Sequence, residues 1–324
     1  MYRASRFALA TLLIGAAALP LSSGAQEYPN KPINLIVPFS AGGTLDNLAR
    51  NLGQKLSESW KQPVVIHNKP GGGTIIGTQQ LARSPADGYT FGMVANSFAI
   101  NPSLQANLPY DTVKDFMPVG LVAYTPHMLV ANPSVPAKNL QEVLQLARSK
   151  PGKLTFASFG TGTSPHIAVE LLKSQSNVDV LHVPYKGQAP ALQDILGGHV
   201  DLMFANVPDV LPHVASGKLR AIGVVSAARI ASAPDVPTFK EQGLDNFESN
   251  SWFGIVAPKG TPTAVIDKLS AEVARIVRLP DMKERLAAQG LEPSGTKPAE
   301  FSKYLNAEME KAGRLVKASG ATVN

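Results

Sequence analysis

The fold is decided by the stretch PINLIVPFSAGGTLD, residues 32–46. Its apolar run, bounded by prolines, predicts a buried strand, and a loop of small residues follows. Leucines then recur at helical spacing, at Leu45, Leu48, Leu52 and Leu56, which predicts an amphipathic helix. A strand, a glycine-rich turn and a helix in this order form the building unit of an α/β fold with parallel strands.

The same unit recurs in two series. The first series continues with a glycine loop and a helix that separate two further strands, at residues 64–66 and 89–94. The second series begins after Pro151-Gly152 and contains three short apolar runs, at residues 154–157, 180–183 and 200–204. We therefore expect two α/β units, each with a mainly parallel sheet.

Two long apolar stretches, residues 119–130 and 251–257, are suited to cross between the units. Two amphipathic helices, one after Thr261-Pro262 and one from near Pro298, are expected to return to the first unit. A chain of 324 residues suits two domains. The prediction is a hinged clamshell in which residues 26–126 and 251–324 form domain 1 and residues 127–250 form domain 2.

The first 25 residues have the pattern of a signal peptide. Two arginines, Arg3 and Arg6, precede an apolar run at residues 7–21, and Ser23-Gly24-Ala25 offers small residues for cleavage after Ala25. The alternative is a membrane anchor, but the run is shorter than a spanning helix needs and Pro20 breaks its end. We expect residues 1–25 to be removed and the mature protein to lie outside the cytoplasm.

Composition excludes several classes of protein. A chain that is 44% hydrophobic and 17% charged is not disordered. The chain has no cysteine, which excludes disulfides, cysteine-based zinc sites and a thiol nucleophile. The net charge of +6 falls to +4 once Arg3 and Arg6 are removed. This small positive charge, without a basic tract, argues against nucleic acid as a partner and suits a protein that interacts with anions.

Three loops carry the expected chemistry, because each joins a predicted strand to a helix start. They are Ser40–Gly43, Gly71–Gly73 and Gly160–Thr163. Ligands of parallel sheets bind at the carboxyl ends of the strands, where free N–H groups at helix starts attract anions. Glycine and serine are also common in ordinary turns. Three such loops at equivalent strand ends nevertheless favour a carboxylate site without an arginine.

Patterns of catalysis are weaker. There is no Gly-x-Ser-x-Gly elbow, and GGGTIIG at residues 71–77 departs from a dinucleotide loop in its glycine spacing. Asp46 is interpreted as a helix cap rather than a general base, and Lys186 as a residue of the cleft rim. The histidines form no zinc pattern: His67, His127, His166, His182, His199 and His213. The sequence therefore predicts no catalytic residue, no metal site and no cofactor.

Several motifs along the mature chain resemble the tripartite tricarboxylate transporter receptors, also called Bug-type proteins. The motifs are Tyr28–Ile33, Val37–Asp46, Asn68–Gly73, Ala86–Thr90, Val183–Gly187 and Trp252–Gly254. The resemblance implies a type II periplasmic binding protein that delivers a small organic anion to a transporter made of two membrane proteins. It also implies that backbone groups, hydroxyls and ordered waters hold the ligand carboxylate.

Carried over residue by residue, the resemblance places ligand contacts in the loops. These are Phe39, Ser40, Ala41, Gly42, Gly43, Asp46, Gly71, Gly72, Gly73, Thr74, Gly160, Gly162, Ser164, His166, Tyr185 and Gly187. Two further contacts, Asn96 and Asn206, are predicted because Met-Val-Ala-Asn and Met-Phe-Ala-Asn end the third strand of each series. Many relatives carry Asp where this chain has Ala205, which weakens an amino-acid ligand and leaves Asn206 as a neutral contact.

The predicted function is that of a periplasmic solute-binding receptor, with no nucleic acid partner and a monomeric state expected. Two alternatives stay open. One is a periplasmic sensory receptor, because sensing and transport both begin with closure of the cleft. The other is an enzyme acting on a small carboxylic acid, for which the sequence offers no positioned nucleophile or metal. The ligand itself can be a dicarboxylate, a tricarboxylate, an aromatic acid or a related amide.

Overall fold

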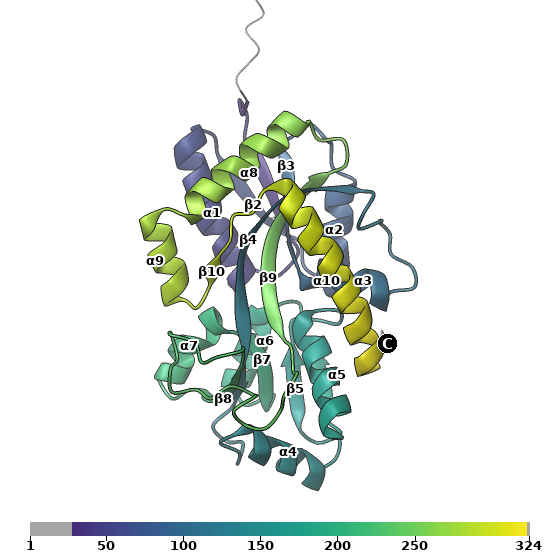
Figure 1. The fold of residues 1–324 in the computed structure, drawn as a ribbon, viewed down its shortest axis with the longest axis vertical. Helices are drawn as coiled ribbons and strands as arrows, with labels where there is room; N and C mark the ends of the chain where they lie inside the picture. The colour runs from purple at the N-terminus through teal and green to yellow at the C-terminus, as the bar shows by residue number, and fades with distance from the viewer. Residues whose placement is uncertain (1–27, 323–324) are drawn as a thin grey trace, which may run out of the picture.

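The computed structural model describes residues 28–322, so the predicted signal peptide lies outside the described residues. Figure 1 shows two α/β lobes, one above the other, joined by two long strands. The first lobe contains β1–β3, α1–α3, α8 and α9, and the second contains β5–β8 and α4–α7. No helix among residues 28–322 combines the length and the apolar composition needed to cross a bilayer.

The first lobe follows the predicted strand–loop–helix order. Its parallel strands are β1 (Ile33–Val37), β2 (Val64–Asn68) and β3 (Thr90–Ala95), with β1 in the middle. Its helices before the crossing are α1 (Thr44–Trp60), the short 3₁₀ turn η1 (Gly72–Thr74), α2 (Ile75–Ala82) and α3 (Asn96–Leu104). The leucine stripe of α1 is buried, as its spacing predicts.

The second lobe repeats this plan. Its parallel strands are β5 (Thr155–Ser158), β6 (Leu181–Pro184) and β7 (Leu202–Asn206), with β5 in the middle. Its helices are α4 (Leu140–Ser149), α5 (Ser164–Ser176), α6 (Gln188–Leu196) and α7 (Val207–Ala215). Each lobe buries its own apolar cluster, so each can hold its loops rigidly.

Both predicted crossings are long strands, β4 (Phe116–Ala131) and β9 (Asn250–Pro258), which pair antiparallel with each other. The path of hydrogen-bonded strands is β2-β1-β3-β9-β4-β7-β5-β6, and β8 (Arg220–Val225) also pairs with β4. The parallel strands of each lobe are therefore joined through antiparallel crossings. The predicted fold class is confirmed, whereas the domain boundaries at residues 126 and 251 stay a prediction.

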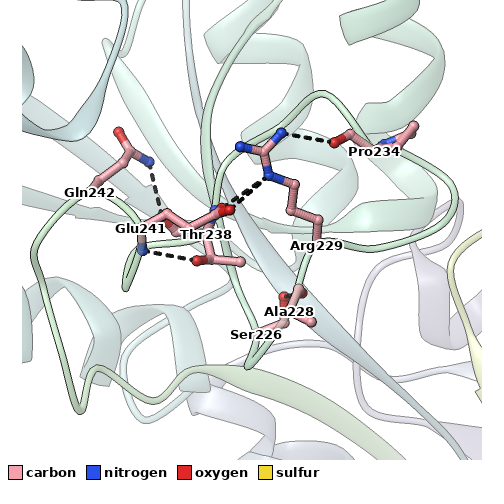
Figure 2. A network of polar contacts seen from close by, with 7 residues as sticks. All are labelled: Ser226, Ala228, Arg229, Pro234, Thr238, Glu241 and Gln242. Atoms are coloured by element: carbon pink, nitrogen blue, oxygen red, sulfur yellow. Dashed lines mark hydrogen bonds and ion pairs between the residues drawn. The ribbon is translucent and has the colours of Figure 1, made fainter.

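The segment between β8 and β9 bonds to Val224 of β8 through its backbone and is held further by a network of side chains (Figure 2). The Arg229 guanidinium contacts both carboxylate oxygens of Glu241 at 3.0 Å and donates to the carbonyl of Pro234 at 3.2 Å. Glu241 in turn accepts from the backbone N–H of Thr238 at 2.7 Å. This network fixes the chain on the outer side of the second lobe before β9 returns to the first.

The chain ends in three helices rather than the predicted two. These are α8 (Thr263–Val277), α9 (Pro280–Ala288) and α10 (Pro298–Ser319), with the short strand β10 (Glu292–Pro293) before the last. The prediction missed α9 because only Met282 and Leu286 are buried in it, too few for a periodic signal. In Figure 1, α10 descends from the first lobe to the side of α5, and it packs against both α3 and α5.

Candidate functional site

Five helices begin around one cavity between the lobes. The first residues of α1, α3, α5 and α6 line it, and so does Asn206, which directly precedes α7. In none of the five helices does the side chain of the residue at the N-cap position cap the helix. The cavity has a volume of about 30 Å³. It is lined by Phe39, Ser40, Gly43, Thr44, Leu45, Asp46, Ala95, Asn96, Ser97, Phe159, Thr163, Ser164, Gln188, Asn206, Ser251 and Phe253.

Two carboxylates of the protein already accept hydrogen bonds from N–H groups at the start of α1. Asp46 accepts from the N–H of Gly42 at 2.9 Å, from Arg50 at 2.9 Å and from Asn68 at 2.9 Å. Burial acts to raise the pKa of Asp46, but hydrogen bonds from Arg50, Gly42 and Asn68 outweigh it and lower that pKa. Asp46 lines the cavity as an ionised cap whose oxygens are bound by protein donors.

The second carboxylate is that of Asp209, which comes from the opposite lobe. One oxygen of Asp209 accepts from the backbone N–H of Thr44 at 2.9 Å and from its hydroxyl at 2.6 Å. Burial raises the pKa of Asp209 to about 6, although the two bonds from Thr44 oppose the shift. The sequence analysis missed this residue; the signal was an acidic residue in the first turn of a helix that follows Asn206.

The two predicted asparagines both line the cavity but have different partners. Asn206 donates to the hydroxyl of Thr44 at 3.1 Å and so joins the contact across the cleft. Asn96 accepts from the backbone N–H of Trp252 at 3.0 Å, which anchors it to β9. Two lining atoms, Oγ of Ser40 and Oδ1 of Asn206, are buried without a hydrogen-bond partner among residues 28–322. Unmet hydrogen-bonding capacity in a polar cleft suits a polar ligand.

A second cavity of about 340 Å³ lies beside the first, and Phe39 and Phe159 line both. Six predicted contacts line this second cavity and not the first: Gly71, Gly72, Gly73, Thr74, Gly160 and Tyr185. Six line only the first: Ser40, Gly43, Asp46, Asn96, Ser164 and Asn206. The predicted site is therefore brought together, but as two adjoining spaces that share two phenylalanine side chains.

Five predicted contacts line neither cavity: Ala41, Gly42, Gly162, His166 and Gly187. Gly162 and Gly187 instead allow close approach of the lobes, because an added Cβ would lie 2.5 Å from Asn101 Oδ1 and 2.4 Å from Ser40 Oγ, respectively. Nine lining residues of the first cavity were not among the predicted contacts, although Thr163 belongs to a predicted loop: Thr44, Leu45, Ala95, Ser97, Phe159, Thr163, Gln188, Ser251 and Phe253.

One pair at the cavity has the composition of a catalytic dyad. Ser251 lines the cavity, and its hydroxyl lies 2.9 Å from Nε2 of His127, whose Nδ1 lies 2.6 Å from the hydroxyl of Ser249. Burial lowers the pKa of His127 to about 3. An imidazole with a lowered pKa is a weak general base at neutral pH, and its two hydroxyl contacts fix the ring against Ser249 and Ser251.

Comparisons with known proteins give a consistent result. The family model described as the tripartite tricarboxylate transporter family receptor matches residues 48–321. The chain is 35% identical to protein BugT of Bordetella pertussis over 312 residues, which cover 96% of each chain. It superimposes on an R. palustris structure solved with adipate with a TM-score of 0.89 and 33% identity, covering 92% of this chain and 100% of the other. A second structure, MatC from Rhodopseudomonas palustris with bound malate, gives a TM-score of 0.85 and 30% identity, covering 89% and 100%.

Proposed function

The chain belongs to the tripartite tricarboxylate transporter receptor family, and from this premise we propose that it captures a small carboxylate between its lobes and delivers it to a two-protein membrane transporter. The observation that carries the proposal is the convergence of five helix starts on one cavity. Free N–H groups at helix starts and the positive ends of the helix dipoles favour an anion there. No arginine or lysine lines this cavity within the described part of the chain, so backbone donors and hydroxyls are the proposed partners.

The size of the cavity supports a hinged mechanism. A volume of about 30 Å³ has room for about two water molecules. This volume is small for a dicarboxylate, and in the proposed mechanism the lobes separate to admit the ligand. Contacts such as Thr44 with Asp209 and Ser40 N–H with the Lys186 carbonyl, at 3.2 Å, would break on opening. The crossing strands β4 and β9 are the proposed hinge, because they pair with each other while β9 also pairs with β3 of the first lobe and β4 with β7 and β8 of the second.

The proposed ligand is an acid with one or two carboxylates. Adipate and malate are bound by the two R. palustris structures described above, and the helix starts of this chain suit the same chemistry. We place the protein in the periplasm, because residues 1–25 have the pattern of a cleavable signal and the family resemblance implies export. A monomer is expected, since both cavities are built from one chain.

Thermal unfolding of the purified mature protein tests the proposal. A panel of mono-, di- and tricarboxylates is added, together with neutral amides of the same acids as controls. A bound acid at 100 times its Kd stabilises the protein by about 2.7 kcal/mol, which raises the melting temperature by about 4 °C for a chain of this length. An amide that stabilises as well as its acid contradicts an anion site. Consumption of the best acid, followed by NMR, would instead favour an enzyme.

A further inference from the structure

The loop Gly160–Thr163, which leads into α5, is tied to two histidines behind it. The N–H of Gly162 donates to Nδ1 of His166 at 3.2 Å. The N–H of Gly160 donates to the hydroxyl of Ser158 at 3.1 Å, and that hydroxyl lies 2.6 Å from Nε2 of His182. Two N–H groups of the loop are thus fixed, directly or through a serine, by imidazole rings.

The two rings form one partly buried unit. They stack with centroids 4.4 Å apart and an interplanar angle of 30°. His166 is only 3% exposed, and neither ring lines the first or the second cavity. Burial lowers the pKa of His166, and burial together with the neighbouring His166 lowers the pKa of His182 to about 3. Both rings are therefore neutral near neutral pH.

The contact with Gly162 fixes the tautomer of His166. An N–H group can donate only to a nitrogen that carries a lone pair, so the ring proton of His166 sits on Nε2. Protonation of Nδ1 would set two N–H groups against each other and break the contact. The charged groups nearest to this ring are Glu170 and Lys173 of the same helix, which pair with each other at 2.9 Å.

We propose that His166 and His182 are positioning residues, which hold the loop so that Thr163 and Ser164 present the start of α5 to the ligand. This inference rests on the proposed function but assigns the histidines no contact with the ligand. It replaces the prediction that His166 binds the ligand directly. The loop needs such an anchor because Gly160 and Gly162, at φ of +128° and +84°, have a backbone that no side chain of their own restrains.

A metal site is the competing interpretation. One ligand atom from each of His166, Glu170 and His182 can be chosen so that the three lie within 4.8 Å of one another. A metal on Nε2 of His166 requires the proton on Nδ1, where the N–H of Gly162 already donates. Metal binding and the loop contact therefore exclude each other, and added zinc becomes a direct test.

Matched substitutions separate positioning from packing. His166→Asn places an amide oxygen close to the position of Nδ1, so the acceptor for Gly162 is kept, whereas His166→Leu fills similar space without it. His182→Gln and His182→Leu form the same pair for Nε2. Isothermal titration with the best acid should show about a tenfold loss of affinity for each leucine variant and less than a threefold loss for each amide variant. Equal losses within a pair would overturn the proposal.

Two further measurements close the test. Affinity should fall in acid as His166 protonates, and His166→Asn should remove this fall relative to the wild type with the same acid. Amide exchange at Gly162, read by NMR, should be faster in His166→Leu than in His166→Asn even without ligand. If the wild type binds no acid, the proposed function is wrong, but the exchange result still tests whether His166 holds the loop at Gly162. Zinc that binds the wild type without speeding exchange at Gly162 would also refute it.

Discussion

The starts of α1 and α5 are similar in sequence but differ in which groups accept hydrogen bonds from their N–H groups. At α1, Asp46 accepts from Gly42 and Asp209 accepts from Thr44. At α5, the equivalent N–H of Gly162 donates to the neutral ring of His166 at 3.2 Å, the hydroxyl of Thr163 donates to the carbonyl of Gly160 at 2.6 Å, and no acidic residue lies in the first turn. A strand, a glycine loop and a helix therefore make an anion site only where the protein does not supply the anion itself.

The comparison favours the α5 side of the cavity for the proposed ligand carboxylate. At α1 two internal carboxylates already use the dipole and the nearest donors, and a third would be repelled. The starts of α3, α5 and α6 line the same cavity with no acidic residue in their first turns. The loops before α1 and α5, which were predicted to be equivalent, thus differ in whether the protein supplies a carboxylate.

The largest effect is expected from placing a carboxylate of the protein itself at the start of α5. Ser164→Asp places one at the first residue of α5, where it should replace the ligand anion as Asp209 does at α1. We expect at least a hundredfold loss of affinity for the best acid, with the melting temperature kept or slightly raised, because acidic residues stabilise helix starts by about 0.3–1 kcal/mol. Isothermal titration and a thermal melt give both values.

The matched control is Ser164→Asn, which has nearly the same size without the charge. It should bind within about fivefold of the wild type, on the order of one neutral hydrogen bond. Unchanged binding by Ser164→Asp would show that the carboxylate does not lie at α5.

The next largest effect should come from blocking the approach of the α5 loop to the first lobe. A Cβ at Gly73 would lie 2.0 Å from the carbonyl oxygen of Thr161, which is backbone and cannot give way. Gly73→Ala should therefore hold the lobes apart and weaken binding by roughly ten- to a hundredfold, as expected for 1–3 kcal/mol of strain. Small-angle scattering should show a more open molecule with saturating acid.

Gly217→Ala controls for backbone strain alone. Gly217 has a similar φ, +71° against +59° for Gly73, but an added Cβ would meet nothing within 4 Å. This variant should lose some stability and keep its affinity. Equal losses of affinity in both variants would rule out hindered closure of the lobes as the cause of weaker binding by Gly73→Ala.

A smaller effect separates the two carboxylates at α1 by their pH dependence. The pKa of Asp209 is raised to about 6 in the folded state, above its ordinary value. The folded state then binds the proton more tightly, so this contribution to stability is full below about pH 4 and is lost as pH rises through 6. For Asp46 the pKa is lowered, so its contribution is lost as pH falls below 4.

Asp209→Asn makes this difference measurable, because its amide oxygen can still accept from Thr44. The melting temperature of the variant should rise relative to the wild type by roughly 2–4 °C between pH 4.5 and 7. Thr44→Val removes one of the two donors that lower the pKa of Asp209, so it should destabilise the protein, and its melting temperature should fall relative to the wild type as pH rises, a slope of opposite sign. A flat difference across this range would mean that Asp209 is not held buried across the cleft.

The sequence predicted what local patterns determine. The strand–loop–helix series of both lobes, both crossings and the start of α5 at Ser164 follow from apolar spacing and from glycine and proline punctuation, whereas α4, α7, β8 and α9 were not predicted. Asp209 could not be found this way, because its partner Thr44 is 165 residues away and lies in the other lobe. The direction of the His166 ring also depends on a neighbouring strand, which carries His182. Helix periodicity places a side chain on a face without naming its partner.

The smallest effect is expected from the two lysines nearest the loops. Lys186 is exposed at the second cavity, and Lys69 follows β2 without lining either cavity. Exposed charges are screened over roughly 10 Å at 0.1 M salt, so Lys69→Met and Lys186→Met should each change affinity by less than about twofold there. At 0.01 M salt the screening length grows to about 30 Å, so charges interact over longer distances. The loss should then grow to a few-fold and appear mainly in the association rate. Stopped-flow binding at the two salt concentrations measures this. Loss of binding in either lysine variant, with Ser164→Asp still binding normally, would replace helix starts by a cationic side chain as the carboxylate's partner.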